Sequence, residues 1–437
     1  MSPVAIGIFS LVGFIVFMFI GLPVPIAMLF FAVVGISIIK SPAAAFQAVS
    51  SDMLNCFMSY SLSVAPIFGL MGFLASYSGI GESLFNAADK FIGHMKGGIA
   101  SSVQIACTLF GAICGSIPAT MGTMVTVAYP EMMKRKYDVS LATASIAAGS
   151  GLAVLIPPSA TMIIYGVIAE ESIGRLFIAG IIPGLILMGL FIASIWLVIN
   201  RNPDKAPLSP KSTWSERWTA LKKGGLIEVL IVFLLSIGGL FMGWFTPTEA
   251  ASVGAMGMLV IGIVERKVDR KKLMTSMVAA TKLAAMVFFM LTSGSVFGRM
   301  FALSTIPTSL AKWVGGLDAA TWMILGAIIF IYFIMGMFID GLAIILITVP
   351  IFSPILSGLG YDGVWYGVLI VLVLVLGGLT PPVGVTCFFM KGFCKEVPLY
   401  TIFSGVWPFV ICVVIAMVLV MMFPALAVWL PTTLYGN

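Results

Sequence analysis

The sequence predicts an all-α polytopic membrane protein made of two inverted repeats, each with a re-entrant helical hairpin and a broken helix. Hydrophobic residues fill 60% of the 437 positions and charged residues only 9%. A soluble core does not need so much apolar surface, and apolar runs long enough to cross a bilayer recur along the chain. Two further observations are paired Pro-Pro breaks and a nearly constant spacing between matching features of the two halves.

The Pro-Pro breaks interrupt apolar segments at 377–384 (GGLTPPVG) and 155–160 (LIPPSA). Two adjacent prolines remove two backbone donors and clash with the preceding helical turn. Broken backbone at membrane depth survives only where protein buries it or where it lines a cavity. Two such breaks in matching contexts indicate a transport site.

Composition also excludes several function classes. The only histidine, His94, lies in a polar turn, and the six cysteines occupy apolar segments without metal-ligand spacing. Zinc chemistry and a Ser-His-Asp triad are therefore not expected. Since no His, Asp or Cys cluster is available for chemistry, we expect no enzyme. The net charge of +6 reflects membrane orientation, so no nucleic-acid partner is expected.

The first half reads as a series of membrane elements. Residues 4–20 form a helix and not a cleaved signal, because no basic segment precedes them. Residues 99–131 hold two short apolar arms around GAICGSIPATMG, which favours a re-entrant hairpin with its tip inside the membrane. The other expected elements are spans at 61–78 and 176–199, an amphipathic surface segment at 82–96 and a Pro-broken segment at 140–169.

Residues 200–223 are the one long polar segment of the sequence. Three prolines make its start a linker. Trp214 and Trp218 are spaced to seat a short helix among lipid headgroups. A plain loop is the alternative interpretation.

The second half repeats the first. Pro23, Asp138 and Pro157 recur as Pro247, Asp362 and Pro381, and the second residue of each pair always lies the same number of positions after the first. Glu171 and Pro183 recur as Glu396 and Pro408, each a single position further along than that spacing requires. Two repeats with a broken helix in each are typical of many secondary transporters.

The basic residues predict the orientation. With a periplasmic N-terminus and an odd number of crossings in each repeat, 18 of the 23 Lys and Arg residues face the cytoplasm. The opposite orientation violates the positive-inside rule. An odd number also turns the second repeat upside down, which favours inverted repeats.

These features divide the chain into scaffold and transport parts. The predicted parts are 1–78 (scaffold helices of repeat 1), 79–199 (transport-domain half 1 with hairpin 1 at about 99–131), 200–225 (cytoplasmic linker or surface helix), 226–275 (scaffold helices of repeat 2) and 276–437 (transport-domain half 2 with hairpin 2 at about 364–395 and the last helix). Within the second scaffold, Thr248 is the expected N-cap of a helix that carries Glu249 in its first turn.

The first hairpin tip, 115–120, has its counterpart at 336–341, and Ser116 corresponds to Asp340. Small residues and Pro at a tip leave carbonyl and N–H groups without helical partners. Carbonyl and hydroxyl oxygens suit Na⁺, whereas half-helix N-termini suit a carboxylate. Tight helix packing is the competing explanation of these small residues.

Arg299 and Asp340 are the charges most deeply placed in apolar sequence. A charge near the bilayer centre costs at least ~2.5–3.5 kcal/mol, so such residues usually face a cavity or pair with each other. Arg299 either holds a substrate carboxylate bidentately or forms a structural pair with Asp340.

Together these residues resemble the large membrane subunit of tripartite ATP-independent periplasmic (TRAP) transporters. The matching stretches, in chain order, are FGAICGSIPATMG, YPEMMKRKYD, AGSGLAVLIPPS, FTPTEAASVGA, MGMFIDGLAIILITVPIFSPIL and GGLTPPVG. The resemblance implies an elevator mechanism driven by a sodium gradient, in the bacterial inner membrane. It also implies a small four-helix membrane subunit, a periplasmic substrate-binding protein, and a small organic acid such as a C4-dicarboxylate or sialic acid as substrate. A stand-alone ion-coupled carboxylate carrier is the alternative.

The resemblance also implies site residues. One Na⁺ site would use Ser116, Ser295 and carbonyls around Gly336, Phe338 and Gly341, and the second would use Gly378, Thr380 and Val383. For the substrate we expect Gly115, Pro118 and Thr120 at the first tip, together with Asp340 and Arg299, of which Arg299 is our own hypothesis. Cys114 stands where family members often carry Ser. If that hydroxyl is a ligand of the ion or the substrate in the family, this chain must use a backbone carbonyl or Ser116 instead, with a different choice of substrate as the consequence.

Overall fold

The structure is a computed structural model that describes residues 2–222, 226–315 and 320–436. Every regular element in these ranges is helical, and seven helical segments are long and apolar enough to cross a membrane. The predicted all-α polytopic class is confirmed. Residues 223–225 of the predicted linker lie outside the described ranges.

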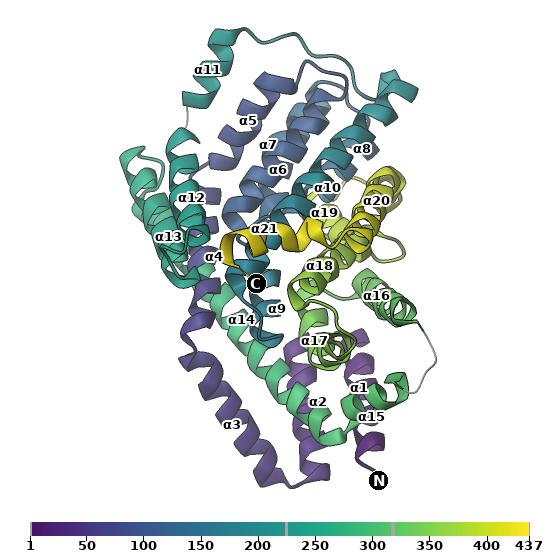
Figure 1. The fold of residues 1–437 in the computed structure, drawn as a ribbon. Helices are drawn as coiled ribbons and strands as arrows, with labels where there is room; N and C mark the ends of the chain where they lie inside the picture. Colours follow the sequence, from purple (N-terminus) through teal and green to yellow (C-terminus); the bar gives the residue numbers. More distant parts are fainter. Residues whose placement is uncertain (1, 223–225, 316–319, 437) are drawn as a thin grey trace.

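The first half of the chain runs from the N-terminus to the polar linker (Figure 1). Its elements are α1 (Pro3–Phe19), α2 (Val24–Ile39), α3 (Pro42–Met58), η1 (Tyr60–Ser63), α4 (Val64–Tyr77), α5 (Ile80–Ile92), α6 (Gly98–Cys114), α7 (Ile117–Lys134), α8 (Val139–Gly151), η2 (Leu152–Val154), α9 (Ala160–Ile168) and α10 (Ile173–Arg201).

The second half follows the linker elements η3 (Pro203–Lys205) and α11 (Trp214–Lys222). Its elements are α12 (Leu226–Phe241), α13 (Pro247–Val264), α14 (Arg270–Ser304), α15 (Ile306–Gly315), α16 (Thr321–Phe338), α17 (Gly341–Gly358), α18 (Gly363–Leu379), α19 (Val385–Phe393), α20 (Leu399–Met422) and α21 (Ala425–Tyr435).

The helix boundaries follow the spacing seen in the sequence. Helices α7 and α17 begin at Ile117 and Gly341, and α8 and α18 begin at Val139 and Gly363, so both pairs of helix starts keep the spacing of the Pro-Pro breaks. By the same shift the counterpart of the α6–α7 hairpin is the pair α16–α17. The segment 364–395, where the sequence placed the second hairpin, instead corresponds to the broken pair α8–α9.

Equivalent aspartates begin the helices that lead into the breaks. The side chain of Asp138 accepts a hydrogen bond from the N–H of Leu141 at 3.1 Å, and that of Asp362 accepts one from Trp365 at 2.8 Å. Each carboxylate satisfies one of the N–H groups that the first turn of a helix leaves unpaired. The repeated Tyr-Asp pair therefore sets the start of α8 and of α18.

Helix α14 joins the second half to the first. It packs on α2, α3 and α4, and Figure 1 shows it crossing the lower part of the molecule beside these helices. Its 35 residues are continuous, so the expected scaffold boundary at 275 falls inside a single helix. No proline interrupts α14, which is why nothing ends it there.

The start of α13 corrects one prediction. The N-cap is Thr246 and not Thr248: the Thr246 hydroxyl accepts from the N–H of Glu249 at 3.3 Å, and the Glu249 carboxylate accepts from the N–H of Thr246 at 2.8 Å. Pro247 lacks an N–H and therefore suits the first helical position, which makes the residue before it the cap.

The linker contains a short helix, as one of the two interpretations predicted. Helix α11 packs on α5, and Lys90 lies 3.7 Å from Glu216 across this contact. Trp214 and Trp218 are both exposed. The placement of these two rings among lipid headgroups remains a prediction.

Candidate functional site

The first hairpin tip packs directly against the first Pro-Pro break. We call Cys114–Thr120 together with Pro157–Ser159 the first tip–break cluster. Gly115 adopts a left-handed conformation with φ +59°, and a Cβ atom there would lie only 2.2 Å from the carbonyl oxygen of Pro158. Only glycine allows both this φ and this approach of backbone to backbone.

The second hairpin tip meets the second break in the same way. The second tip–break cluster comprises 336–341 and 377–384. The N–H of Gly384 donates to the carbonyl oxygen of Met337 at 3.0 Å. A Cβ atom on Gly377 would lie 2.6 Å from the carbonyl carbon of Gly336. Both Pro-Pro peptide bonds, 157–158 and 381–382, are cis.

Backbone oxygens converge inside the second cluster. The carbonyl oxygens of Thr380 and Gly378 lie 3.1 and 3.3 Å from the point where a Cβ of Gly384 would stand. The Thr380 side chain is buried, and its hydroxyl donates to the carbonyl of Leu376 at 2.7 Å. Within the described residues, that hydroxyl accepts no hydrogen bond. Val383, the third residue expected here, is half-buried in the same loop.

The first tip offers hydroxyls and an exposed turn. Ser116 occupies the N-cap position of α7, yet its side chain makes no capping bond and no other hydrogen bond within the described part of the chain. Thr120 is buried, with its hydroxyl 3.1 Å from the sulfur of Cys114. Pro118 is exposed. Gly115, Ser116, Pro118 and Thr120 lie within one turn at this tip, and their role in binding stays a prediction.

At the second tip, Asp340 is the N-cap of α17. Its carboxylate accepts a hydrogen bond from the N–H of Leu342 at 3.1 Å, so the charge is engaged by its own helix. Gly336 is buried against the break, while Phe338 is exposed and Gly341 half-buried. This tip therefore presents backbone groups and one carboxylate, which caps its own helix.

The close contacts at each tip run within one repeat. The first expected Na⁺ site combined Ser116 from the first tip with Gly336, Phe338 and Gly341 from the second, whereas the structure packs each tip against the break of its own half. Ser295 is exposed on α14. Its neighbour Gly294 contacts Leu346, inside an arm of the second hairpin.

Arg299 is paired, but not with Asp340. Its Nε donates to Oδ2 of Asp52 at 3.2 Å, and its Nη2 donates to Oδ1 of the same carboxylate. The expected partner was therefore wrong. This bidentate pair joins α14 to α3 and occupies the guanidinium edge that the other hypothesis reserved for a substrate carboxylate.

Sequence reasoning missed Asp52, which is 5% exposed on α3. The signal was present, since Asp52 is the one acidic residue between the N-terminus and Glu82. It was overlooked because its partner Arg299 lies in the other half of the sequence. The carbonyl of Pro158 was missed because backbone groups leave no mark in a sequence.

Comparisons with known proteins agree with this architecture. The family model for the DctM component of tripartite ATP-independent periplasmic transporters matches residues 11–426. The ectoine TRAP transporter large permease TeaC of Halomonas elongata is 33% identical, with 94% of this chain and 95% of that protein covered. The C4-dicarboxylate TRAP transporter large permease DctM of Pseudomonas aeruginosa is 32% identical, with 86% and 87% covered.

One more relative and two solved structures are also similar to this chain. The sialic acid TRAP transporter large permease SiaM of Vibrio cholerae is 31% identical over 98% of this chain and 99% of its own length. Neisseria gonorrhoeae MtrF (TM-score 0.62, 12% identity, 98% and 95% covered) and the Alcanivorax borkumensis YdaH transporter (TM-score 0.58, 15% identity, 88% and 90% covered) share the fold. The protein described here belongs to the DctM family, the large permease component of TRAP transporters.

Proposed function

We propose that this permease imports a small organic carboxylate by sodium-coupled symport. Family membership makes the chain a transporter component and not an enzyme. Its relatives are named for ectoine, C4-dicarboxylates and sialic acid. Each of these three compounds carries a carboxylate, and a further relative is named for isethionate, which carries a sulfonate. We take the carboxylate as the anionic group that the translocation site of this chain recognises.

The observation that supports sodium coupling most directly is that the carbonyl oxygens of Thr380 and Gly378 lie close together beside Gly384. Na⁺ is a hard cation that prefers oxygen ligands, and unwound backbone in broken membrane helices commonly supplies them. The carbonyl oxygens of Thr380 and Gly378 lie within 3.3 Å of one location beside Gly384, which the ring of Phe403 also approaches to 3.1 Å. Residues 378–383 would hold the ion there, with the Thr380 hydroxyl as an additional ligand.

A second Na⁺ site would use the first cluster. The carbonyl of Pro158 points at the tip, and the Ser116 hydroxyl has no partner within the described chain. By the repeat spacing, the counterparts of Pro158 and Ser116 in the second cluster are Pro382 and Asp340. The bound ion would supply positive charge that favours an anionic substrate nearby.

The substrate carboxylate would bind at the N-terminal end of α7. The first N–H groups of a helix and its dipole favour an anion. Ser116, Pro118 and Thr120 lie at this end, and no side-chain carboxylate caps it. At α17 the carboxylate of Asp340 already occupies the equivalent place. Arg299 would act by holding α3 against α14, since Asp52 engages its guanidinium.

The repeats suggest how the substrate would move. Inverted halves in the bacterial inner membrane, with a periplasmic N-terminus, would bring the two tip–break clusters together near mid-membrane. We propose that the part carrying both clusters slides against α1–α4 and α12–α14 as an elevator. A periplasmic binding protein would deliver the substrate, and a small four-helix membrane subunit would complete the complex.

Proteoliposome uptake tests this proposal. Vesicles containing the permease and the small subunit would receive binding protein and candidate labelled acids, with an inward Na⁺ gradient or an equal K⁺ gradient. We expect accumulation only with Na⁺ and only with the binding protein. Uptake indifferent to Na⁺ would contradict the ion sites, and equal uptake without either partner would favour a stand-alone carrier.

A further inference from the structure

A cavity of about 680 Å³ lies where the end of α4 meets the first four turns of α14. None of its lining residues belongs to a tip–break cluster. Tyr77 contributes from α4, and all other lining residues come from α14 between Arg270 and Lys282. The function proposed above makes no use of it.

The cavity is lined by cations without acidic partners. Arg270, Lys271 and Lys282 are exposed, and none of them forms an ion pair among the described residues. Nearby Lys267 differs, because it lies 3.6 Å from Glu265. Three uncompensated charges around one cavity attract an anion.

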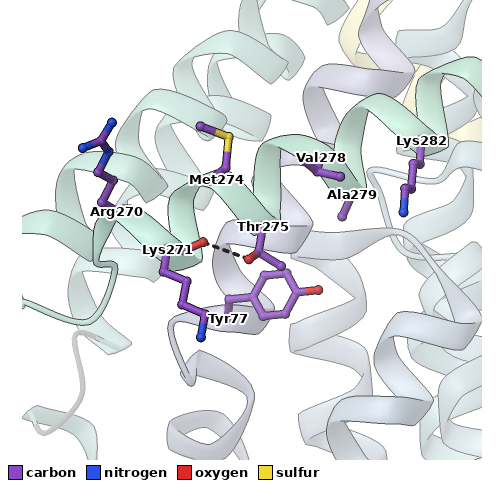
Figure 2. Close-up of a pocket in the computed structure, with 8 residues that line it drawn as sticks. All are labelled: Tyr77, Arg270, Lys271, Met274, Thr275, Val278, Ala279 and Lys282. Carbon is purple, nitrogen blue, oxygen red and sulfur yellow. Dashed lines mark hydrogen bonds between the residues drawn. The ribbon is translucent and has the colours of Figure 1, made fainter.

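The charged residues lie at both ends of an apolar strip. Lys271 and Lys282 are three helical turns apart, which is about 16 Å along α14 at 1.5 Å per residue. Met274, Val278 and Ala279 line the cavity between them. Figure 2 shows Lys271, Thr275 and Lys282 pointing to the side of α14 where Tyr77 lies. The cavity therefore combines charge with apolar surface, as an amphipathic ligand requires.

Its position in the chain points to a membrane boundary. Arg270 begins a helix that is apolar enough to span a bilayer, and the basic run 266–272 precedes that span. Deeper along the helix, Gly69 of α4 contacts Leu283, beside Lys282. A long Lys side chain at this depth extends its ammonium group toward the headgroups. This position suits a cavity at the level of a lipid headgroup.

We propose that this cavity binds an anionic phospholipid of the cytoplasmic leaflet. Lys271 contacts the phosphate, Lys282 adds attraction for the same charge from the far end of the strip, and the Tyr77 hydroxyl, which has no hydrogen bond within the described chain, donates to the phosphate. The acyl chains lie along Met274 and Val278. Charge complementarity selects the anionic lipid, because a basic pocket between membrane helices on the cytoplasmic side suits such headgroups.

Native mass spectrometry of the purified permease tests the proposal. The protein in neutral detergent is titrated with phosphatidylglycerol and with phosphatidylcholine of the same acyl chains. We expect tighter binding of phosphatidylglycerol. The double variant Lys271→Gln/Lys282→Gln should lose roughly 30-fold in affinity for it, about five-fold for each charge, with little change for phosphatidylcholine.

Two further variants make the test specific. Lys211→Gln/Lys222→Gln removes the same charge from the exposed linker region and should keep wild-type affinity. Ala279→Phe fills the apolar part of the cavity and should weaken phosphatidylglycerol binding although every charge remains. Equal affinity of the wild type for the two lipids, or an equal loss in the linker control, would overturn the proposal. So would wild-type affinity in the Lys271/Lys282 variant.

Discussion

At the level of single residues, the pair between Asp52 and Arg299 shows how a membrane protein tolerates charge. The Asp52 side chain is 6% exposed and the Arg299 side chain 48% exposed. A buried carboxylate without a partner is costly, so the pair is a structural necessity once Asp52 is present. The partners are 247 residues apart, which explains why the sequence did not identify them.

Neutralising one partner should therefore destabilise the protein more than neutralising both. We expect Arg299→Gln to cost about 1.5–3 kcal/mol, because it removes a hydrogen-bonded charge from Asp52. The double variant Asp52→Asn/Arg299→Gln should recover part of this loss. Thermal unfolding in detergent measures both effects. A double variant that is no more stable than Arg299→Gln alone would show that the pair is not coupled.

Gly377 provides a second test at this scale. A methyl group there would overlap the backbone of Gly336, so Gly377→Ala should cost about 1–3 kcal/mol through overpacking. The matched control is Gly326→Ala in α16, where nothing lies within 4 Å of the added Cβ. That change should be neutral or stabilising by up to about 1 kcal/mol, because Ala favours a helix. Similar melting temperatures for both variants would contradict the close tip–break contact.

At the level of elements, local sequence signals predicted the helices well. Paired prolines located both helix breaks. Errors arose where two residues offered the same local chemistry. Thr246 and Thr248 flank Pro247, and only the preference of Pro for the first helical position separates them. The second hairpin is predicted at 364–395, while the repeat spacing relates the α6–α7 hairpin to 321–358, and both segments carry a Gly-rich interruption.

The two Asp caps give a prediction for the repeated elements. Asp138→Ala and Asp362→Ala should each cost about 0.5–2 kcal/mol, since each removes a side-chain cap from an equivalent helix. Asp204→Ala is the control, because Asp204 is exposed in the linker and caps no α-helix. Thermal unfolding at neutral pH compares the three. Loss of stability in the control to the same extent would contradict the capping role.

The Asp138 cap should also depend on pH. Partial burial alone would raise its pKa, but hydrogen bonds from Ser140 and the N–H of Leu141, with the charge of Lys205, hold the pKa of Asp138 below its ordinary value. A lowered pKa stabilises the fold above the unfolded-state pKa, and this contribution is lost as pH falls through the folded-state value. The stability difference between wild type and Asp138→Asn should therefore shrink on acidification. A stability difference between the two proteins that stays constant down to acid pH would contradict this role of the ionised Asp138 carboxylate.

At the level of the whole molecule, the repeat spacing relates the two halves of the chain. One constant shift along the chain relates helix starts, N-cap residues and Pro-Pro breaks, and the structure adds that each tip packs against the break of its own half. The sequence predicted where the hairpin tip of the first half and the two Pro-Pro breaks lie, but it did not predict which of these segments contact one another. Backbone carbonyls make those contacts, and side-chain identity does not reveal where carbonyls point.

Sodium-dependent stability of the purified permease tests the central claim most directly. The melting temperature is compared in NaCl and in KCl at equal ionic strength for the wild type, Thr380→Ala and Ser116→Ala. An ion that binds only the folded state stabilises it, by about 2.7 kcal/mol at 100 times its Kd. We predict that Na⁺ raises the wild-type melting temperature above its value in K⁺ and that each variant loses part of this increment while it still folds in KCl. Equal melting temperatures of the wild type in the two salts would contradict sodium binding at the tip–break clusters.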